Sequence, residues 1–433
     1  MKKMVCLRSL FITGQALKII LSITIIGFIA NSCSHEEPLK VESNDLIPIE
    51  LSTRGGDFVD HGNSFAFKLL QKVEQEEKSN FTLSPLSLSL AFGMLIEGAE
   101  DGPILDSVCK VLGYEEGGRQ DIKEFCSTMM KRLPEMDKMS TVSMSNLVVT
   151  NNDIASPDKA FQTAVSNYHN SYLKSLPFLN KQGVCDYINK WGYENSNKMI
   201  KETIKESDFN SLTTAILVNS LYFKGQWANY FKKSKTENES FTTEQGDVKK
   251  VKMMKQEGIF EMGSFENTSI LRMPYGNGAY VFDVFLPWDD ALGVKDVIKS
   301  IMSLGGEYSH SLYKRKVDVW LPKFEGSLRI DLEKILKEMG METAFDEAWL
   351  KILDMNDKPE SSISKCFQMS SIKVDETGTE AAAESVITAA LGASSSSFNE
   401  PQTYVFHADR PFVYTIRETS TGAVLFSGVY RGE

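Results

Sequence analysis

Residues 214–227 read TAILVNSLYFKGQW, and the first ten of them are nearly all apolar. A strand with one solvent-exposed face alternates apolar and polar residues, whereas a continuous apolar run of this length predicts a strand that is buried on both faces. We therefore expect a core large enough to enclose this strand.

The segments around this strand divide into a helix-rich first half and a strand-rich second half. Apolar spacing and helix-start signals predict helices at residues 65–73, 88–95, 121–133, 183–204 and 330–339. Strand patterns predict strands at residues 271–273, 279–286, 317–321, 403–407, 411–418 and 423–430. The chain shows no repeats and no linker in its middle. It therefore predicts one α+β domain over residues 59–433.

The first 32 residues have the pattern of an export signal. Four basic residues flank an apolar run at 19–30, which is shorter than the roughly 20 residues that span a bilayer. The run ends in Ala30-Asn31-Ser32-Cys33, which resembles a bacterial lipoprotein signal with a lipidated cysteine. An ordinary secretory signal cut near Ser32 is the alternative.

Residues 33–58 are mostly polar and include Pro38, Pro48 and two adjacent glycines, which predicts a solvated tether. The stretch His35-Glu36-Glu37 resembles the acidic opening of lipoproteins that are sent to the outer surface. We expect an exported protein that the lipid on Cys33 anchors to the bacterial outer membrane. The acidic opening favours display on the outer surface, and display on the inner leaflet is the alternative.

Composition argues against several partners. The formal net charge is −11, and removal of the signal with its four basic residues would make it more negative. A chain this acidic is a poor match for nucleic acid or heparin. The cysteines that follow the tether form no C-x-x-C pair, so we expect separate, mostly buried thiols: Cys109, Cys126, Cys185 and Cys366.

The sequence lacks the common motifs of catalysis. It contains no H-E-x-x-H metal motif, no G-x-S-x-G nucleophile elbow and no P-loop, and no two of its five histidines stand at metal-ligand spacing. We expect a monomer with no enzymatic activity, no metal and no cofactor.

One segment departs from the rest of the chain. Residues 377–399 read TGTEAAAESVITAALGASSSSFN, almost all Ala, Ser, Thr and Gly. Helix propensity alone would place a helix at 380–391. A long segment of small residues before the terminal strands also fits a functional surface loop.

Five blocks, in the same order as in the serpin family, resemble serpin signatures over nearly the whole domain. They are 80–87 (NFTLSPLS), 217–227 (LVNSLYFKGQW), 319–324 (VWLPKF), 376–383 (ETGTEAAA) and 410–413 (RPFV). The resemblance implies the serpin fold, with three β-sheets, eight or nine helices and an exposed reactive loop. It also implies that a target protease cleaves the loop, whose first half then inserts into the main sheet as a new strand and traps the acylated protease.

The resemblance assigns roles to three groups of residues. The hinge of the loop is Gly378, Thr379, Glu380, Ala381, Ala382 and Ala383. A cluster at the top of the main sheet, where a Lys-Glu pair would hold the sheet shut, comprises Trp227, Lys323 and Glu376. A polar cluster under the centre of the sheet comprises Ser84, Ser87, Asn219 and Gln368. Gln368 stands where the family often has a histidine, and it can donate and accept in the same way.

The hinge passes a physical test for insertion. Successive side chains of a strand point to opposite faces, and the positions from Thr379 to Ala389 on one parity are all small or apolar. The two charges, Glu380 and Glu384, share the other parity. Glu384 replaces an alanine that is usual in inhibitors, but it should not block insertion.

The scissile bond predicted by the family's usual distance from Glu376 is Gly392-Ala393, and Leu391-Gly392 is the alternative. Cleavage after Leu391 fits elastase-like or chymotrypsin-like proteases, which are the first expectation for a partner. Cleavage after Gly392 fits a papain-like cysteine protease, the second. A non-inhibitory serpin and a surface lipoprotein that binds other ligands remain the alternative functions.

The lipoprotein signal makes a testable prediction. Replacing Cys33 with Ala should release the protein from membranes or leave its precursor unprocessed, because no thiol would remain for lipidation. Fractionation of cells that express each form measures this. Unchanged membrane association of the variant would contradict the prediction.

Overall fold

The computed structural model describes residues 43–168, 171–289, 291–305, 308–355, 360–378 and 402–432, which all belong to one compact unit. Cys33, the hinge residues 379–383 and both candidate scissile bonds (Leu391, Gly392 and Ala393) lie outside the described residues. Gly378 is the one hinge residue within them.

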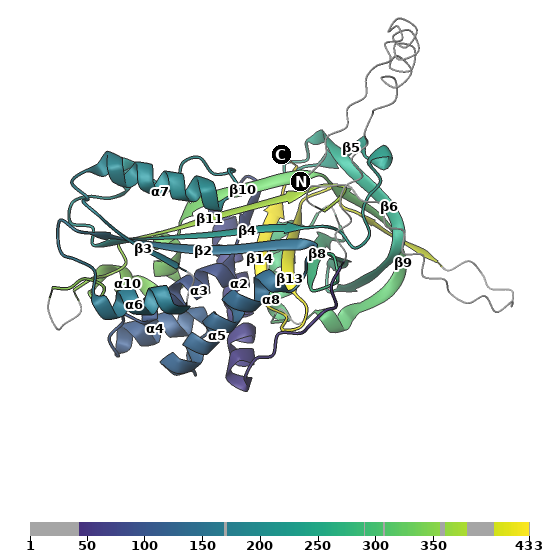
Figure 1. Cartoon of the computed structure of the whole chain (residues 1–433). Helices are drawn as coiled ribbons and strands as arrows, with labels where there is room; N and C mark the ends of the chain where they lie inside the picture. The colour runs from purple at the N-terminus through teal and green to yellow at the C-terminus, as the bar shows by residue number, and fades with distance from the viewer. Residues whose placement is uncertain are drawn as a thin grey trace, which may run out of the picture. The chain divides into compact units, whose positions relative to one another are not determined.

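Six of the nine described helices lie in the first half of this unit, where the sequence predicts that helices dominate (Figure 1). These six are α2 (Thr53–Glu76), α3 (Pro85–Ile96), α4 (Pro103–Leu112), α5 (Arg119–Arg132), α6 (Lys159–Tyr168) and α7 (Lys181–Asn195). The second half holds α8 (Val294–Ser303), α9 (Glu333–Leu336) and α10 (Glu342–Asp346). A π-helical turn at Lys337–Met341 joins α9 to α10. The described helices therefore number eight or nine, depending on whether this pair is counted as one.

A five-stranded sheet forms the centre of the molecule. Its strands, in spatial order, are β10 (Phe324–Asp331), β11 (Lys365–Val374), β4 (Ala215–Gly225), β2 (Ser140–Asn151) and β3 (Ser171–Leu176). β11 and β4 are parallel, and the residue pairs between them run from Lys365–Ile216 to Ser371–Tyr222. The outer neighbours β10 and β2 are antiparallel to them.

The other strands form a nine-stranded sheet. They are β1 (Phe81–Leu83), β14 (Val424–Tyr430), β13 (Phe412–Glu418), β8 (Tyr280–Pro287), β7 (Thr268–Pro274), β6 (Val248–Phe265), β9 (Leu312–Pro322) and β12 (Thr403–His407), with β5 (Glu237–Thr242) paired to β6. The 18-residue strand β6 belongs to two parts of this sheet: residues 248–253 pair with β5, 253–263 pair with β9, and 261–265 pair with β7. Divided within β6, these parts are the second and third sheets of the predicted three, and the predicted α+β class is confirmed.

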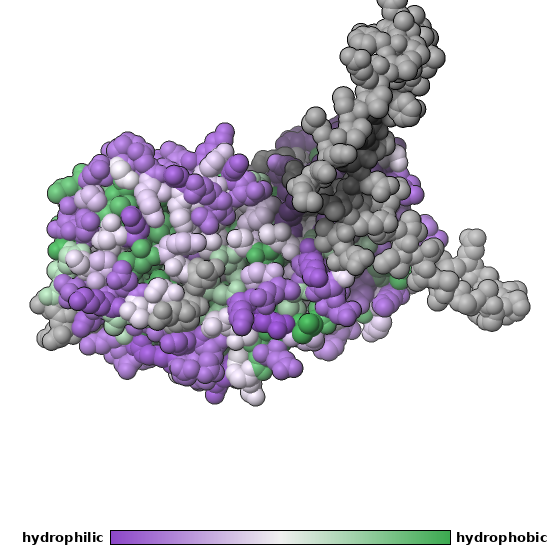
Figure 2. All heavy atoms as spheres, viewed as in Figure 1, coloured by the Kyte–Doolittle hydropathy of each residue, from purple (hydrophilic) through white to green (hydrophobic). Residues whose placement is uncertain are grey.

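Strand β4 is buried on both faces, as its apolar sequence predicts. On one face, Leu217, Leu221 and Phe223 join the main core with α2 and α3. On the other, Ile216 and Val218 join a second core under α7. Figure 1 shows α7 on one side of the sheet and α2 to α5 on the other. Hydrophilic residues cover most of the described surface in the matching view (Figure 2).

Three expectations need correction. The folded unit begins before residue 59: Ser52 accepts a hydrogen bond from the backbone N–H of Gly55 to start α2, and Ile49 is buried, so the last residues of the predicted tether belong to the domain. The predicted helix at 183–204 ends at Asn195, because Asn197 and Lys198 adopt positive φ angles. The start of the predicted helix at 330–339 belongs instead to β10, where Ile330 pairs with Gln368.

No helix within the described ranges is both long enough and apolar enough to cross a membrane.

Candidate functional site

The five-stranded sheet is the main sheet of the prediction, and we call the end at which β4 and β11 finish its top. The three predicted residues of the sheet-top cluster lie together there. Glu376 follows β11, Lys323 lies between β9 and β10, and Trp227 lies just beyond β4. Lys323 Nζ donates to Glu376 Oε2 at 2.8 Å. The Trp227 indole N–H donates to the carbonyl of Asp375 at 2.8 Å, and its ring stacks on Tyr275 with the centroids 4.3 Å apart.

The carboxylate of Glu376 is held by more than Lys323. Thr236 Oγ1 donates to Glu376 Oε1 at 2.9 Å, and the backbone N–H of Phe231 donates to the Glu376 carbonyl. Burial raises the pKa of Glu376, but the hydrogen bonds from Lys323 and Thr236 outweigh burial and bring the pKa below its ordinary value. Glu376 is therefore ionised and fixed at neutral pH.

Gly378 ends the described chain at this site in a tight turn. It exchanges backbone hydrogen bonds with Asp375, and its φ of +102° is one that residues with a Cβ rarely adopt. A Cβ at this position would lie 2.2 Å from the carbonyl oxygen of Gly225, the last residue of β4. The turn thus sets Gly378 against the end of β4.

The predicted polar cluster also assembles, under the centre of the sheet. Gln368 of β11 accepts from the Ser84 backbone N–H at 3.0 Å and donates to the Ser84 carbonyl at 2.8 Å. Asn219 of β4 donates to Ser87 Oγ at 2.6 Å. Gln368 Nε2 also donates to Asn219 Oδ1 at 3.2 Å. Ser84 precedes α3 and Ser87 lies in its first turn, so the start of α3 binds both β4 and β11.

The hydroxyl of Ser84 makes no hydrogen bond to any described residue. Within the cluster, the backbone of Ser84, and not its side chain, binds Gln368.

Sequence reasoning missed two members of these clusters. Asn146 of β2 accepts from Asn219 Nδ2 at 2.7 Å, so the polar cluster extends across a third strand. Thr236 joins the sheet-top cluster through Glu376. No local pattern marks either residue, because each contact depends on strand pairing or chain packing between distant segments.

A row of side chains across the nine-stranded sheet also escaped prediction. It holds β12, the strand to which the chain returns after residue 401. His407 stacks on Trp320 with the ring centroids 4.0 Å apart and contacts Asp318 at 2.8 Å. Lys255 lies 4.1 Å from the centroid of the Trp320 ring and pairs with Glu237 and Glu239 of β5. The row ties the edge strand β12 to β9, β6 and β5.

The described residues offer little for metal or thiol chemistry. They include no group of three or more His, Cys, Asp or Glu side chains placed to hold a metal ion. Cys109, Cys126, Cys185 and Cys366 are free. Burial raises the pKa of Cys126 to about 12 and the pKa of Cys109 to about 11, so both thiols are protonated at neutral pH.

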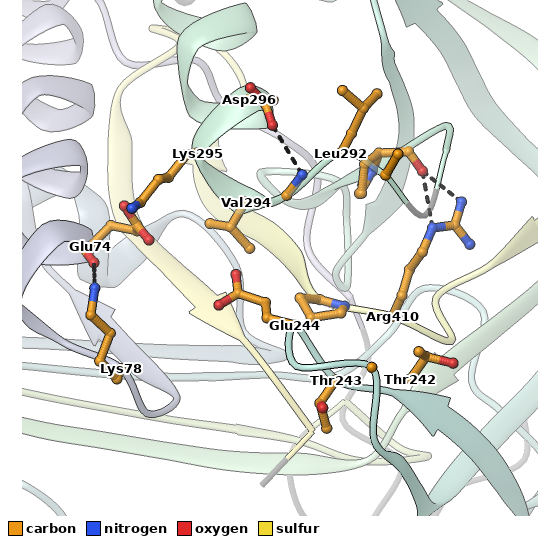
Figure 3. Close-up of a pocket in the computed structure, with 15 residues that line it drawn as sticks. Glu74, Lys78, Thr242, Thr243, Glu244, Leu292, Val294, Lys295, Asp296 and Arg410 are labelled. Atoms are coloured by element: carbon orange, nitrogen blue, oxygen red, sulfur yellow. Dashed lines mark hydrogen bonds between the residues drawn. The ribbon is translucent and has the colours of Figure 1, made fainter.

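A hollow of about 470 Å³ lies apart from both clusters (Figure 3). The end of α2, residues 242–246, the start of α8 and Arg410 line it. Two of its acids, Glu74 and Glu244, bind Arg431 at 3.2 and 3.3 Å, and Lys78 donates to the Glu74 carbonyl. The hollow shares no residue with the sheet-top or the polar cluster.

Comparison with known proteins identifies the family. A family model described as serpin (serine protease inhibitor) matches residues 60–431. Neuroserpin of Gallus gallus is 31% identical over 366 residues, which cover 81% of this chain and 86% of that protein. Neuroserpin of Homo sapiens is 28% identical over 362 residues, with the same coverage.

Solved structures agree with this match. The thermophilic serpin tengpin in its native state has 25% identity and a TM-score of 0.76, and the match covers 91% of this chain and 98% of tengpin. Human thyroxine-binding globulin in complex with its ligand has 24% identity and a TM-score of 0.76, with 87% and 98% coverage, and shows the fold alone. The chain therefore belongs to the serpin family of serine protease inhibitors.

Proposed function

We propose that this protein is an inhibitory serpin that acts as a suicide substrate. A target endopeptidase, serine-type first, cleaves the segment 379–401, and the part before the cut inserts between β4 and β11. From the signal at Cys33 we also propose that it acts outside the cell, held by a lipid anchor.

The observation that carries the proposal is the parallel pairing of β11 with β4. The chain leaves β11 at Val374 and turns back at Gly378 beside the end of β4. A strand that runs back between β11 and β4 from this turn would be antiparallel to both. One parallel ladder would then become two antiparallel ladders, which are slightly more stable per residue.

The energy available is large enough to drive such a change. About fifteen inserted residues, each gaining roughly 1 kcal/mol net per hydrogen bond, give on the order of 10 kcal/mol. This matches the total stability of a typical domain. The uncleaved protein would then be metastable.

The faces of β4 and β11 suit the hinge. Positions that face α3, such as Leu221 and Ile372, are apolar and buried, and small hinge residues such as Ala381 and Ala383 would enter beside them. The opposite face is partly exposed at Lys224 and Lys373, so Glu380 and Glu384 would keep their charges in contact with solvent there. This composition argues against the non-inhibitory alternative.

The sheet-top cluster acts as a gate in this mechanism. Glu376 is fixed to Lys323 and to the 231–236 segment, so β11 and the following turn cannot move freely. Cleavage would release the far end of the segment and let insertion proceed past this point.

Replacing Lys323 with Gln should lower the free energy of unfolding of the intact protein by about 1–3 kcal/mol at pH 7, because it removes a charge-assisted hydrogen bond from a buried carboxylate. The pKa of Glu376 is lowered in the folded state. Its contribution is therefore present above the ordinary carboxyl value of 4.5 and is lost as the pH falls through the lower folded value. Urea unfolding of wild type and variant at several pH values measures the difference.

The matched control is Lys373→Gln, which removes a partly exposed ion pair with Glu325. It should cost less than about 1 kcal/mol. Equal costs for the two substitutions would contradict the role of Lys323 as part of a gate.

Incubation with elastase, chymotrypsin, papain and trypsin tests the inhibitory function directly. We expect SDS-resistant adducts with at least one of the first three enzymes, and a released C-terminal fragment that begins between Gly392 and Asn399 by mass spectrometry. The cleaved protein should melt tens of degrees higher than the intact form. The absence of adducts together with an unchanged melting temperature would overturn the proposal.

Thr379→Arg should convert the inhibitor into a substrate, because its guanidinium would be buried unpaired during insertion at a cost of several kcal/mol. Insertion would slow and the acyl-enzyme would hydrolyse first. Glu384→Ala, on the opposite parity, is the control and should retain inhibition. The number of inhibitor molecules consumed per protease inactivated measures both, and equal loss would refute the parity argument.

A further inference from the structure

Six exposed lysines gather on one hairpin near the sheet-top cluster. They lie in and beside the 3-10 turn η3 (Lys233–Lys235) and in the first half of β6: Lys232, Lys233, Lys235, Lys249, Lys250 and Lys252. Across the described part of the chain, no carboxylate forms an ion pair with any of these six lysines. We name them the basic hairpin.

The acidic residues of the same hairpin do not neutralise these lysines. Glu237 and Glu239 both bind Lys255, and Glu244 binds Arg431. Asp247, exposed in the turn between β5 and β6, offsets one charge. Residues 232–255 hold seven lysines and four acidic residues, so this hairpin carries a net positive charge on a chain whose net charge is −11.

The chain that carries the basic hairpin is hydrogen-bonded to Glu376, three residues before the segment 379–401. Its lysines at 232–235 lie between Phe231 and Thr236, which both hydrogen-bond to Glu376. The carbonyl of Lys252 accepts from the backbone N–H of Lys323, the partner of Glu376. A partner that covers the basic hairpin therefore also faces the chain where it leaves the sheet.

We propose that the basic hairpin is a docking surface for an acidic patch on the target protease; this inference rests on the proposed inhibitory function. Lys249 points to one face of β6 and Lys250 and Lys252 to the other, and the adjacent β5 pairs with β6 on one side of the ladder. A partner must therefore reach around the hairpin to contact both sets, which the surface loops of a globular protease can do. A flat membrane would contact one set and cover the start of the reactive segment.

Attraction between the basic hairpin and the protease should change the rate of association and leave the stability of the trapped complex unchanged. Complementary charge raises the association rate by 10-fold to 1,000-fold, and salt screens it. These lysines hold no ion pair with any residue that the structure describes, so their removal should leave folding intact.

The experiment uses the protease that forms adducts fastest, in native form and after succinylation, which turns its surface lysines into carboxylates. The test variant is Lys233→Gln/Lys249→Gln/Lys252→Gln. The control variant, Lys68→Gln/Lys110→Gln/Lys131→Gln, removes three exposed lysines of α2, α4 and α5, at the far end of the molecule from β5 (Figure 1). The measured quantity is the second-order rate constant of inhibition at low and high salt.

We expect the test variant to react about tenfold more slowly than wild type with the succinylated protease at low salt, and equally fast at high salt. The control variant should keep the wild-type rate. Adducts that form at the same rate with both variants would overturn the docking surface and leave the inhibitory function standing. The docking surface would also be overturned if the test variant inhibits the protease at the wild-type rate but binds dextran sulfate or anionic lipid vesicles more weakly than wild type does. That result would favour a polyanion or a membrane as the partner. A wild-type chain that forms no adduct would instead overturn the proposed function.

Discussion

The parallel ladder between β4 and β11 is the contact on which the other features depend. Seven residue pairs join the two strands, and beyond Ser371 and Tyr222 each strand continues toward the top of the sheet while paired to its outer neighbour. Parallel pairs are slightly weaker than antiparallel ones. The five-stranded sheet thus has a weaker ladder at its centre, between two antiparallel ladders. The sheet-top cluster lies at one end of this ladder, and the polar cluster lies under it.

The start of α3 holds the two strands of this junction together, and we call this contact the clasp. Ser84 binds Gln368 of β11 and Ser87 binds Asn219 of β4, so separation of the two strands must break one set of bonds or move the helix end. Because Gln368 carries no proton that titrates near neutral pH, the clasp should hold equally across the range in which a histidine would change charge. Asn146 extends the same hydrogen-bond network to β2. The β4 side of the junction therefore has one more strand in this network than the β11 side.

Sequence reasoning recovered the elements whose signal is local. The apolar run at 214–223 and the terminal strands appear where predicted, and the spacing of Phe65, Leu69 and Val73 marks α2. It failed where tertiary contacts prevail: Ile330 has helical spacing but pairs with β11, and Ile49 lies buried within a segment that is polar on average. The two clusters were found through family motifs, since a lone Lys323 or Glu376 has no pattern of its own. Asn146 stayed hidden because strand register brings it to Asn219, and Thr236 because the packing of distant chain segments brings it to Glu376.

The length of β6 has a mechanical consequence. The strand runs unbroken through both parts of the nine-stranded sheet, and eleven residue pairs join it to β9. The edge strand β12 is joined to β9 by five pairs. When tension acts along neighbouring strands, the load is shared among the bonds of each ladder, and the shorter ladder reaches its breaking force first. Under a pull on the returning chain, β12 would therefore be the first strand to detach, while β6 and the hairpin at its end would stay fixed to the body of the molecule.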